Sequence, residues 1–441
     1  MSLRLHAISL ICAGTGLALG TTAAHGSGFQ LLEQNASGLG NAYAGQAANP
    51  EDASAVYSTP AGLTRFPGRQ FVASLIALRP AAEFNNTGSC APYAGTGAGT
   101  TSCPFGSGGN LGHSRGGDGG DAGDWAAIPS VYLSWELVPS QVWVGVGVNA
   151  PFGLKTEWDS TWMGRFHAVE SEVQTININP SVAWKINEMV SVGGGINAQR
   201  LKTTLSNAVS YRAVALASGS PALIGATPGG SEGLATVEGD DWGWGWNLGV
   251  LFNVTPATQV GVTYRSKIKY TVDGDVSFAN RPAAMGVVPQ VADGGVEARI
   301  ELPDTWSLAL SHQLTPQLQL LFDYTRTGWD SIDELDIRRN SGALSGQTLA
   351  STPLNFKNAW RVGFGANYQL NQAWKLRGGV AYDNGNASDE FRTPRLPDSD
   401  RIWFALGAQW AFAPNMALDF GYVYIKVKDA DSVMLADVAL G

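Results

Sequence analysis

The chain has 441 residues and a formal net charge of −9, and only 15% of its residues are charged. Soluble domains carry about 25% charged residues, so this composition favours a membrane protein. The mean hydropathy is −0.03. Beyond the N-terminus no run of about 18 apolar residues occurs, which excludes membrane-spanning helices and leaves strands as the spanning elements. The acidic balance argues against nucleic acid as a partner.

Residues 1–26 have the pattern of a secretory signal peptide. Arg4 precedes an apolar core at residues 7–19, and small residues lead to a cleavage point after Gly26. Cys12 lies inside the apolar core, where its neighbours do not fit a lipid-attachment site. The sequence therefore predicts export without a lipid anchor.

Residues 27–66 follow neither a helical period nor a strand alternation, although the rest of the chain does read as strands. The segment is rich in glycine, alanine and serine, which suits a compact stretch whose backbone packs closely against surrounding walls. We predict that it plugs the inside of a barrel. The alternative is a flexible secreted N-terminus.

From residue 69 onward, alternating strands are joined in pairs by very short turns and separated by long polar loops. Each short turn carries proline or asparagine, which set or tolerate turn dihedrals. The six turns lie at residues 138–141, 186–189, 254–257, 314–317, 370–373 and 412–415. They join twelve strands, and one more strand fits at residues 69–84 and another from about Val433. The total predicted is fourteen.

The strands alternate as a transmembrane barrel requires, with apolar side chains toward lipid and polar ones inward. In residues 317–325, for example, Leu320 and Phe322 share one face and Gln319 and Asp323 the other. Aromatic residues cluster near the strand ends, as at a membrane interface. The predicted fold is all-β: a 14-stranded antiparallel transmembrane β-barrel over residues 67–441 with the N-terminal plug in its lumen.

The end of the sequence departs from the usual barrel pattern. Outer-membrane barrels generally end with an aromatic residue that the barrel assembly machinery reads, whereas this chain stops at Leu440-Gly441. The last strand is therefore expected to be truncated.

Charged residues at inward positions are predicted to lie in the lumen. Their role is either structural, holding the plug through ion pairs, or substrate binding. They are Arg265, Lys267, Asp323, Arg361, Arg377, Arg401 and Asp419.

Cysteine and histidine usage indicates no enzyme and no metal. Cys90 and Cys103 lie in one Gly/Ser-rich stretch and form a disulfide candidate in an exported chain, with two free thiols as the alternative. No histidine lies in a nucleophile motif, and no metal-ligand cluster occurs. We expect no cofactor and no catalytic residue.

Two groups of motifs carry a resemblance to a known family. The first is Gly28-Phe29-Gln30-Leu31, the run from Ser37 to Gly45, and Thr59-Pro60-Ala61-Gly62-Leu63. The second is the run from Asn149 to Trp158, continued by Trp162-Met163-Gly164-Arg165-Phe166. These motifs resemble the long-chain fatty acid transporter (FadL) family of Gram-negative outer membranes, in which the first group forms the N-terminal hatch. The hatch motif residues carried over are Gly28, Gly38, Gly40, Pro60 and Ala61.

The resemblance implies a function. In this family a hydrophobic ligand is captured among outer loops, passes to a pocket behind the hatch, and leaves sideways through a gap in the barrel wall. We therefore expect a monomer in the outer membrane of a Gram-negative bacterium, in contact with outer-membrane lipid and assembled by the barrel assembly machinery. Its expected activity is passive uptake of hydrophobic small molecules, either long-chain fatty acids or neutral aromatic hydrocarbons.

The predicted wall gap is Ala150, Pro151, Phe152 and Gly153. Proline cannot donate to a strand ladder and glycine permits a bend, so inter-strand pairing should fail there. The alternative is an ordinary strand end that leads into a loop.

The predicted ligand-binding residues come from the plug, two loops and one strand. Apolar residues in an exposed loop need burial or a ligand. The alternative is that the apolar loop residues pack on each other. A fatty acid carboxylate needs a basic partner at the end of an apolar pocket, and the basic binding positions of the family do not align with basic residues of this chain. The candidates are Phe29, Leu31 and Leu32 in the plug, Tyr211, Leu216, Met285 and Val288 in the loops, and Arg200 and Lys202 as cations.

Two other classes of function remain open. Long outer loops also suit a surface adhesin or phage receptor. An unplugged barrel of this size would be a porin, which passes small polar solutes through an aqueous lumen. Loop deletion and ion conductance would separate these classes from a transporter.

Overall fold

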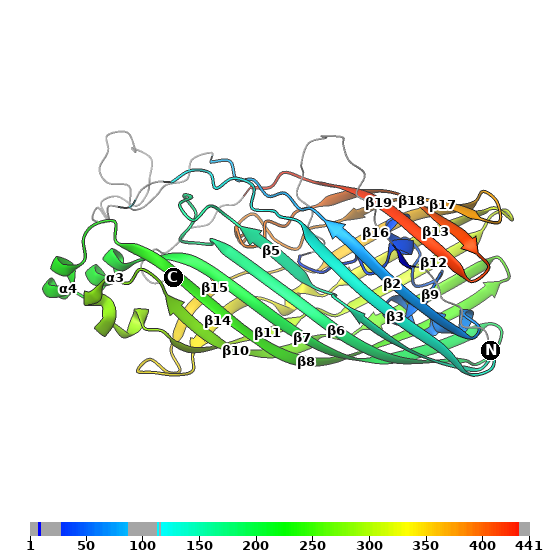
Figure 1. Ribbon diagram of the computed structural model, residues 1–441, viewed down its shortest axis with the longest axis horizontal. Helices are drawn as coiled ribbons and strands as arrows, with labels where there is room; N and C mark the ends of the chain where they lie inside the picture. Colours follow the sequence, from blue (N-terminus) through cyan, green and yellow to red (C-terminus); the bar gives the residue numbers. More distant parts are fainter. Residues whose placement is uncertain (1–7, 10–27, 87–112, 114–115, 432–441) are drawn as a thin grey trace.

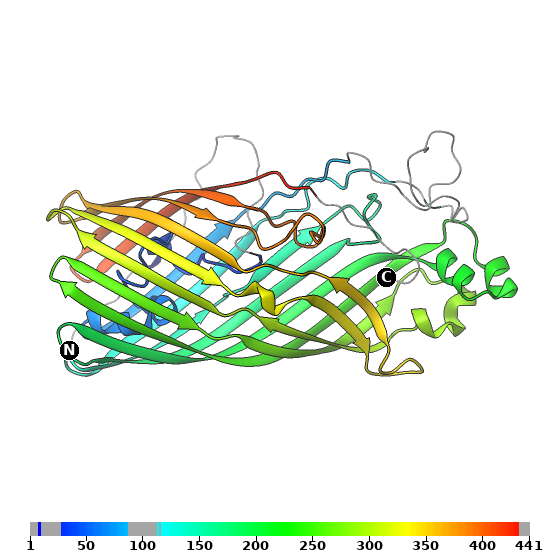
Figure 2. The same ribbon diagram turned by 180° about the vertical axis from the view of Figure 1, so that it is seen from behind.

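The computed structural model describes residues 8–9, 28–86, 113 and 116–431. Its nineteen strands belong to one sheet, which curls into an elongated tube (Figures 1 and 2). Paired strands run antiparallel; the exception is β1, which runs parallel to β2. The two residues of β1 belong to the segment that the sequence predicts to be removed on export. We call the tube formed by β2–β19 the wall.

The strands have the following bounds. They are β1 Ile8–Ser9, β2 Arg69–Leu78, β3 Ala126–Val138, β4 Val142–Asn149, β5 Gly153–Glu157, β6 Glu170–Lys185, β7 Val190–Ser210, β8 Glu232–Thr255, β9 Thr258–Arg265, β10 Ile268–Phe278, β11 Gly294–Leu302, β12 Thr305–Gln313, β13 Leu318–Thr327, β14 Glu334–Arg339, β15 Thr348–Pro353, β16 Ala359–Gln369, β17 Trp374–Asp383, β18 Arg401–Ala413 and β19 Met416–Val427.

All six short turns that the sequence predicts are present. They join β3 to β4, β6 to β7, β8 to β9, β12 to β13, β16 to β17 and β18 to β19. All lie at one end of the tube, at the right of Figure 1. We call this the turn end and the opposite one the loop end. The prediction of short turns on one side and long connections on the other is confirmed.

The predicted count of fourteen strands stays a prediction, because several wall strands are split and one expected strand is not described. β4 and β5 both pair with β6, so they are one strand with an interruption. β9 and β10 both pair with β8 in the same way. Bulges insert extra residues and re-aim side chains, which periodicity does not reveal. The strand expected from Val433 lies outside the described residues, as do Cys90, Cys103 and the truncation expected at the C-terminus.

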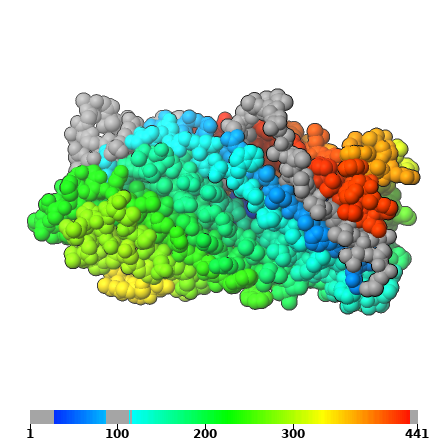
Figure 3. All heavy atoms as spheres, viewed as in Figure 1, coloured from blue at the N-terminus to red at the C-terminus, as the bar shows by residue number. Residues whose placement is uncertain are grey.

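The outward face of the wall is apolar and the inward face is mixed, as the alternation predicts. In β18, Ile402, Phe404 and Leu406 are exposed, whereas the alternate residues Arg401, Trp403 and Ala405 are buried inside the tube. Figure 3 shows the last strands (red) near the turn end, and the segments around residues 205–235 and 275–295 (green to yellow-green) at the loop end. No helix in the described part of the chain is long and apolar enough to cross a membrane.

Residues 28–66, which we call the N-terminal segment, lie inside the tube near the turn end (dark blue in Figure 1). The segment contains the short helices α1 (Ala36–Leu39), α2 (Ala55–Ser58) and the 3-10 turn η1 (Pro60–Arg65). Wall strands on every side contact it, from β4 through β8 to β18 and β19. Most of its residues are buried. The segment is therefore enclosed by the wall.

Glycines in the wall permit this close fit. A Cβ atom at Gly261 would lie 1.9 Å from the Ala47 carbonyl oxygen, and one at Gly379 would lie 2.2 Å from the Asn41 carbonyl oxygen. A side chain at either position would push the N-terminal segment away from the wall. The small residues that sequence analysis noted in the segment thus face small residues in the wall.

Five further short helices lie in the connections of the loop-end half. They are α3 (Tyr211–Ala217), α4 (Pro221–Ala226), η2 (Ala283–Val287), η3 (Pro289–Val291) and η4 (Trp329–Ser331). The first four cover the tip of the loop end, whereas η4 turns inward between β13 and β14, where Trp329 is fully buried. This inward turn helps to form the site described next.

Candidate ligand-binding site

Phe29 lies at the boundary between the N-terminal segment and the empty part of the lumen. Its ring centroid is 4.8 Å from that of Trp329 and 5.9 Å from that of Phe152. All three side chains are buried. Tilted rings at these distances attract each other beyond the burial of their area. Phe29 is thus held by one aromatic residue from each of two interrupted strands.

The wall is interrupted at Ala150–Phe152, between β4 and β5. The ladder between β3 and β4 ends at Val131 opposite Val148, and in the described part of the chain β5 pairs only with β6. The first residues of β3 therefore have no strand beside them on this side. The local loss of pairing expected at Pro151 is found.

The backbone of this interruption bonds to the N-terminal segment. Leu31 N donates to Pro151 O at 2.8 Å, and Gly153 N donates to Phe29 O at 2.9 Å. The Gln34 side-chain amide donates to Ala150 O at 2.9 Å. Backbone groups need partners when they are buried, so moving Phe29–Leu31 would leave those at the wall interruption unsatisfied. The position of the segment and the shape of the interruption are coupled.

An apolar cavity of about 110 Å³ lies on the loop side of Phe29. Side chains from β5, β6, β7, β8, β10, β11, β14 and β15 border it, with Phe356 and Leu396 from the loops. Leu201, Val272 and Val296 are among the buried residues of its lining. Glu238 and Glu297 also border it, but both occupy outward-facing positions of their strands. Glu238 lies between inward Val237 and Gly239, and Glu297 lies between inward Val296 and Ala298.

The apolar side chains around Phe29 come from interruptions of the wall. Phe152 lies between β4 and β5, Trp329 and Ile332 lie between β13 and β14, and Phe356 lies between β15 and β16. They form one buried cluster with Phe29. A regular strand alternates its side chains between lipid and lumen, whereas an interruption can turn extra ones inward. The interruptions thus supply the apolar surface of the lumen.

Arg395 is the cation at this cavity. It lies in the connection between β17 and β18, and its guanidinium donates to Glu170 O at 3.2 Å, Ser171 Oγ at 3.0 Å and Asn207 Oδ1 at 3.3 Å. All of these acceptors are neutral, and within the described residues no carboxylate lies at ion-pair distance from it. Burial lowers the pKa of Arg395 to about 10, which still leaves it charged at neutral pH.

The two cations that the sequence suggested lie elsewhere. Arg200 is exposed on the outward face of β7 and pairs with Asp240 at 3.0 Å. Lys202 is exposed one outward position further along. Neither borders the cavity. Side chains alternate along β7, and Leu201 points inward. Its two neighbours, Arg200 and Lys202, therefore point away from the lumen.

The predicted loop residues gather in one cluster at the loop end. Tyr211, Met285 and Val288 are buried against one another and against Val214 and Val291. Leu216 is partly exposed at 39%. Most of this group therefore packs on itself, which is the alternative that the sequence left open. Their role in capture stays a prediction.

Four of the five hatch motif residues lie where the N-terminal segment meets the wall, and Gly38 lies inside the segment. Gly28 has a φ of +60° beside Trp329, and a Cβ at Gly40 would lie 2.8 Å from Gly407 Cα. Gly38 lies in α1, and its backbone N–H donates to the side chain of Asn35, which caps that helix. Pro60 and Ala61 begin η1, where Ala61 N would lie 2.5 Å from a Cβ at Gly193.

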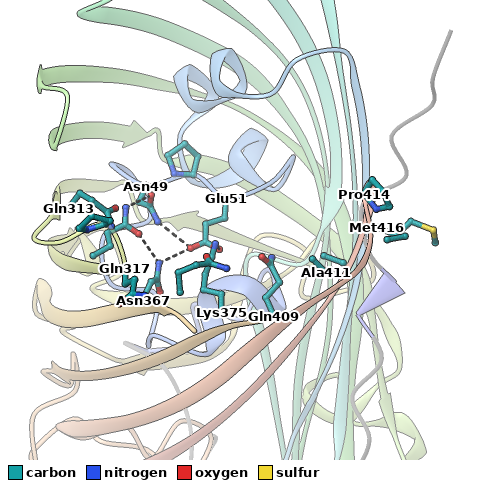
Figure 4. Close-up of a pocket in the computed structure, with 16 residues that line it drawn as sticks. Asn49, Glu51, Gln313, Gln317, Asn367, Lys375, Gln409, Ala411, Pro414 and Met416 are labelled. Atoms are coloured by element: carbon teal, nitrogen blue, oxygen red, sulfur yellow. Dashed lines mark hydrogen bonds and ion pairs between the residues drawn. The ribbon is translucent and has the colours of Figure 1, made fainter. Parts of the chain in front are cut away.

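A polar cavity of about 520 Å³ lies on the other side of the N-terminal segment, at the turn end. Figure 4 shows Glu51, Asn367 and Lys375 pointing toward one another, with Asn49 beside them. Glu51 pairs with Lys375 at 3.2 Å and also with buried Arg377, whose other partner is Asp419 at 2.7 Å.

Several inward charges bind the N-terminal segment. Besides Arg377, Arg361 pairs with Asp323 at 3.0 Å and donates to Ala42 O, and Arg265 donates to Tyr57 O at 3.0 Å. Lys267 instead pairs with Glu301 at 2.9 Å and is 39% exposed, so its expected lumen position is wrong. Arg401 pairs with Asp398 of the connection between β17 and β18. The contacts of Arg265, Arg361 and Arg377 favour the structural role over substrate binding. In the part of the chain that the structure describes, no group of three metal-ligating side chains is found.

Comparisons with known proteins agree with this architecture. Residues 17–436 match the family described as "Outer membrane protein transport protein (OMPP1/FadL/TodX)". The chain is 30% identical over 429 residues to outer membrane protein P1 of Haemophilus influenzae, covering 94% of this chain and 89% of that protein. It is 28% identical over 436 residues to a long-chain fatty acid transport protein of Escherichia coli, covering 93% and 90%.

Solved structures give the same result. A FadL homologue from Pseudomonas aeruginosa matches with a TM-score of 0.76 and 25% identity over 94% of both chains. The toluene transporter TodX of P. putida matches with a TM-score of 0.63 and 18% identity over 87% of this chain and 90% of that one, which shows a shared fold. The fold and the lumen site define an outer-membrane transport protein, not an enzyme. The chain belongs to the FadL family, as its motifs suggested.

Sequence reasoning missed Arg395 and Trp329. Arg395 lies in Thr393-Pro394-Arg395-Leu396-Pro397, where two prolines mark a shaped loop but not its direction. Trp329 follows Gly328 at the end of β13, and nothing in the alternation indicates that it turns inward.

Proposed function

We propose that this protein mediates passive uptake of hydrophobic small molecules across the outer membrane, with long-chain fatty acids as the substrate. The cavity between Phe29 and Arg395 is the observation that carries the proposal. Its surface is apolar, which suits an acyl chain, and a buried charged guanidinium that has no carboxylate partner among the described residues suits a carboxylate. The curated relatives named as long-chain fatty acid transport proteins support the same class.

The proposed route begins at the cluster of Tyr211, Leu216, Met285 and Val288, where the ligand leaves water. It continues to the cavity, where Phe29 closes the path toward the turn end. The ligand then leaves sideways through the interruption at Ala150–Gly153. This route avoids the polar turn-end cavity, where an apolar molecule would gain nothing. Leu31 and Leu32 follow Phe29 in the N-terminal segment and would move with it.

Release requires Phe29 to leave its place. The two backbone bonds that join Phe29–Leu31 to the wall interruption break in that movement, so a ligand that displaces Phe29 also loosens the interruption. Binding and exit are in this way linked by the same residues. The gain from burying an acyl chain, about 0.8 kcal/mol per methylene, is of the size needed to offset the loss of a few hydrogen bonds.

Uptake assays with two ligands test the proposal. Cells that express the protein are expected to accumulate labelled oleate faster than cells that lack it, and Phe29→Ala is expected to reduce that rate. Arg395→Gln is expected to weaken oleate uptake by about tenfold, the factor that corresponds to 1.4 kcal/mol, and to leave toluene uptake unchanged. Arg392→Gln is the matched control, since Arg392 is buried in the same loop, does not border the cavity and pairs with Asp389.

Neutral aromatic hydrocarbons are the second candidate, because Phe29 and Phe356 border the cavity. Toluene uptake that is faster than oleate uptake, together with indifference to Arg395→Gln, would favour this class. No uptake of either ligand by the unaltered protein would overturn transport altogether.

A further inference from the structure

A second interruption of the wall lies between β8 and β10. The ladder of β8 with β9 ends at Asn247 opposite Arg265, and that with β10 begins at Asp240 opposite Asp273. The six residues 241–246 therefore lie opposite the seven residues 266–272. No strand pairing joins these two stretches. An extra residue on one strand disrupts the ladder locally.

The two edges of this interruption are joined mainly by side chains. Ser266 N donates to Trp246 O, and Trp246 N donates to Ser266 Oγ, both at 2.9 Å. At the other end Thr271 N donates to the Asp241 carboxylate at 2.7 Å. A stretch with few backbone bonds opens at a lower free-energy cost than a continuous ladder.

Two apolar side chains cover the interruption from inside. Ile268 and Tyr270 are buried. A Cβ added at Gly243 would lie 2.4 Å from Ile268 and 2.8 Å from Tyr270, and one added at Gly245 would lie 2.8 Å from Ile268. They belong to the same cluster as Phe29 and Leu201. The apolar cavity reaches this place, since Leu201, Gly239 and Val272 border it.

Three tryptophans line the interruption from outside. Trp242, Trp244 and Trp246 occupy successive outward positions of β8 and are 49%, 70% and 46% exposed. On one side of them the outward face is apolar, with Leu248 and Phe252, and on the other it carries Asp240. Tryptophan favours this boundary in membrane barrels. The interruption therefore lies where the apolar band of the wall ends on the loop side.

We propose that this interruption is a second lateral passage through the wall, through which an apolar small molecule moves between the edge of the bilayer and the cavity. Ile268 and Tyr270 close it. Glycine, tryptophan, isoleucine and tyrosine line it, so its ligand class is the one proposed for the cavity, and the inference rests on that proposed function. It differs from the route at Ala150–Gly153 in its strands and in its independence from the N-terminal segment's backbone bonds.

Single-residue deletions give a matched pair of variants. Ala150–Phe152 stands opposite Thr175 and Ile176, again one residue longer than its partner stretch. Deletion of Pro151 realigns β4–β5 with β6 and is expected to close the first interruption. Deletion of Lys267 realigns β9–β10 with β8 and is expected to close the second. Heat-modifiable migration on gels checks that each variant folds.

Oleate and toluene uptake are then measured in cells. Deletion of Pro151 alone is expected to leave a reduced but measurable uptake, and deletion of both residues is expected to abolish it. Loss of all uptake on deletion of Pro151 alone would overturn the second passage while the proposed function stands. Absence of uptake by the unaltered protein would instead overturn the proposed function, so the two failures are distinguishable.

A variant that opens the second passage keeps the inference testable if the double deletion fails to fold. Ile268→Ala with Tyr270→Ala, in the chain without Pro151, is expected to raise uptake severalfold. Val296→Ala with Ile337→Ala is the control, because these residues border the same cavity within a paired ladder. Equal uptake in both pairs would show that cavity size alone matters and would overturn the inference.

Discussion

The two halves of the lumen hold their contents in opposite ways. In the turn-end half the strands from β2 round to β19 pair in register up to the bulges beside the turns, and their inward side chains are glycines and charged groups that fix the N-terminal segment. In the loop-end half the ladder is interrupted, and the interruptions turn Phe152, Ile268 and Trp329 inward around a cavity. A regular ladder thus serves to hold a fixed segment, whereas an irregular one builds a space for a ligand.

The difference has a physical cause. Charged groups in a lumen need partners, and a rigid segment with a fixed sequence can supply them at fixed positions. A ligand that comes and goes cannot, so the surface that receives it must be stable when empty. Aromatic and aliphatic side chains that pack on each other satisfy this need. Phe29 lies at the border and belongs to the segment by sequence but to the cavity by its contacts.

The largest effect is expected from breaking the ion cluster of the turn-end half. Arg377→Met leaves Glu51 and Asp419 buried without their shared partner, which costs about 3–5 kcal/mol. The free energy of unfolding and the protease resistance of the N-terminal segment should both fall.

Lys375→Met is the matched control, because Lys375 binds the same Glu51 carboxylate but is more exposed. It is expected to cost less than half as much. Equal costs for the two variants would contradict the view that burial, rather than the number of ion pairs, decides how firmly the segment is held.

A smaller effect is expected from adding one methyl group to the wall. Gly379→Ala places a Cβ 2.2 Å from Asn41 O and should cost about 1–3 kcal/mol, as overpacking generally does. Gly378→Ala, its neighbour on β17, meets no atom closer than 3.9 Å and should be nearly neutral. Denaturant unfolding in bilayers measures both. A neutral Gly379→Ala would show that the segment adjusts and is not tightly enclosed.

At the border between the halves, Phe29→Leu is expected to cost about 1 kcal/mol, since it keeps an apolar side chain but loses the ring contacts with Phe152 and Trp329. The loss should weaken oleate uptake, while the turn-end half keeps its resistance to protease. Loss of that resistance would show that Phe29 belongs mechanically to the plugged half.

The sequence predicted the turn-end half better than the loop-end half. The six turns, the alternation in β18 and the inward positions of Arg361 and Arg377 follow from period-2 patterns and turn residues, which are local. The interruptions around Trp329 and Ile268 depend on the register between strands distant in sequence. Arg395 depends on how a proline-rich loop folds back into the lumen. Only the break at Pro151 had a local signal, a proline two residues before a glycine.

The smallest effect is expected outside the wall. Arg200→Ala removes an exposed ion pair with Asp240, and such pairs contribute about 0–1 kcal/mol. Arg200 lies on the outer face of the wall, whereas its neighbour Leu201 faces the cavity. Oleate uptake by Arg200→Ala should therefore stay unchanged, in contrast to the loss expected for Arg395→Gln. An uptake defect in Arg200→Ala as large as that of Arg395→Gln would place carboxylate recognition on the outer face of β7 and remove the reason for assigning it to the cavity. The two arginines thus separate recognition inside the lumen from recognition at the membrane surface, with the same charge removed in each case.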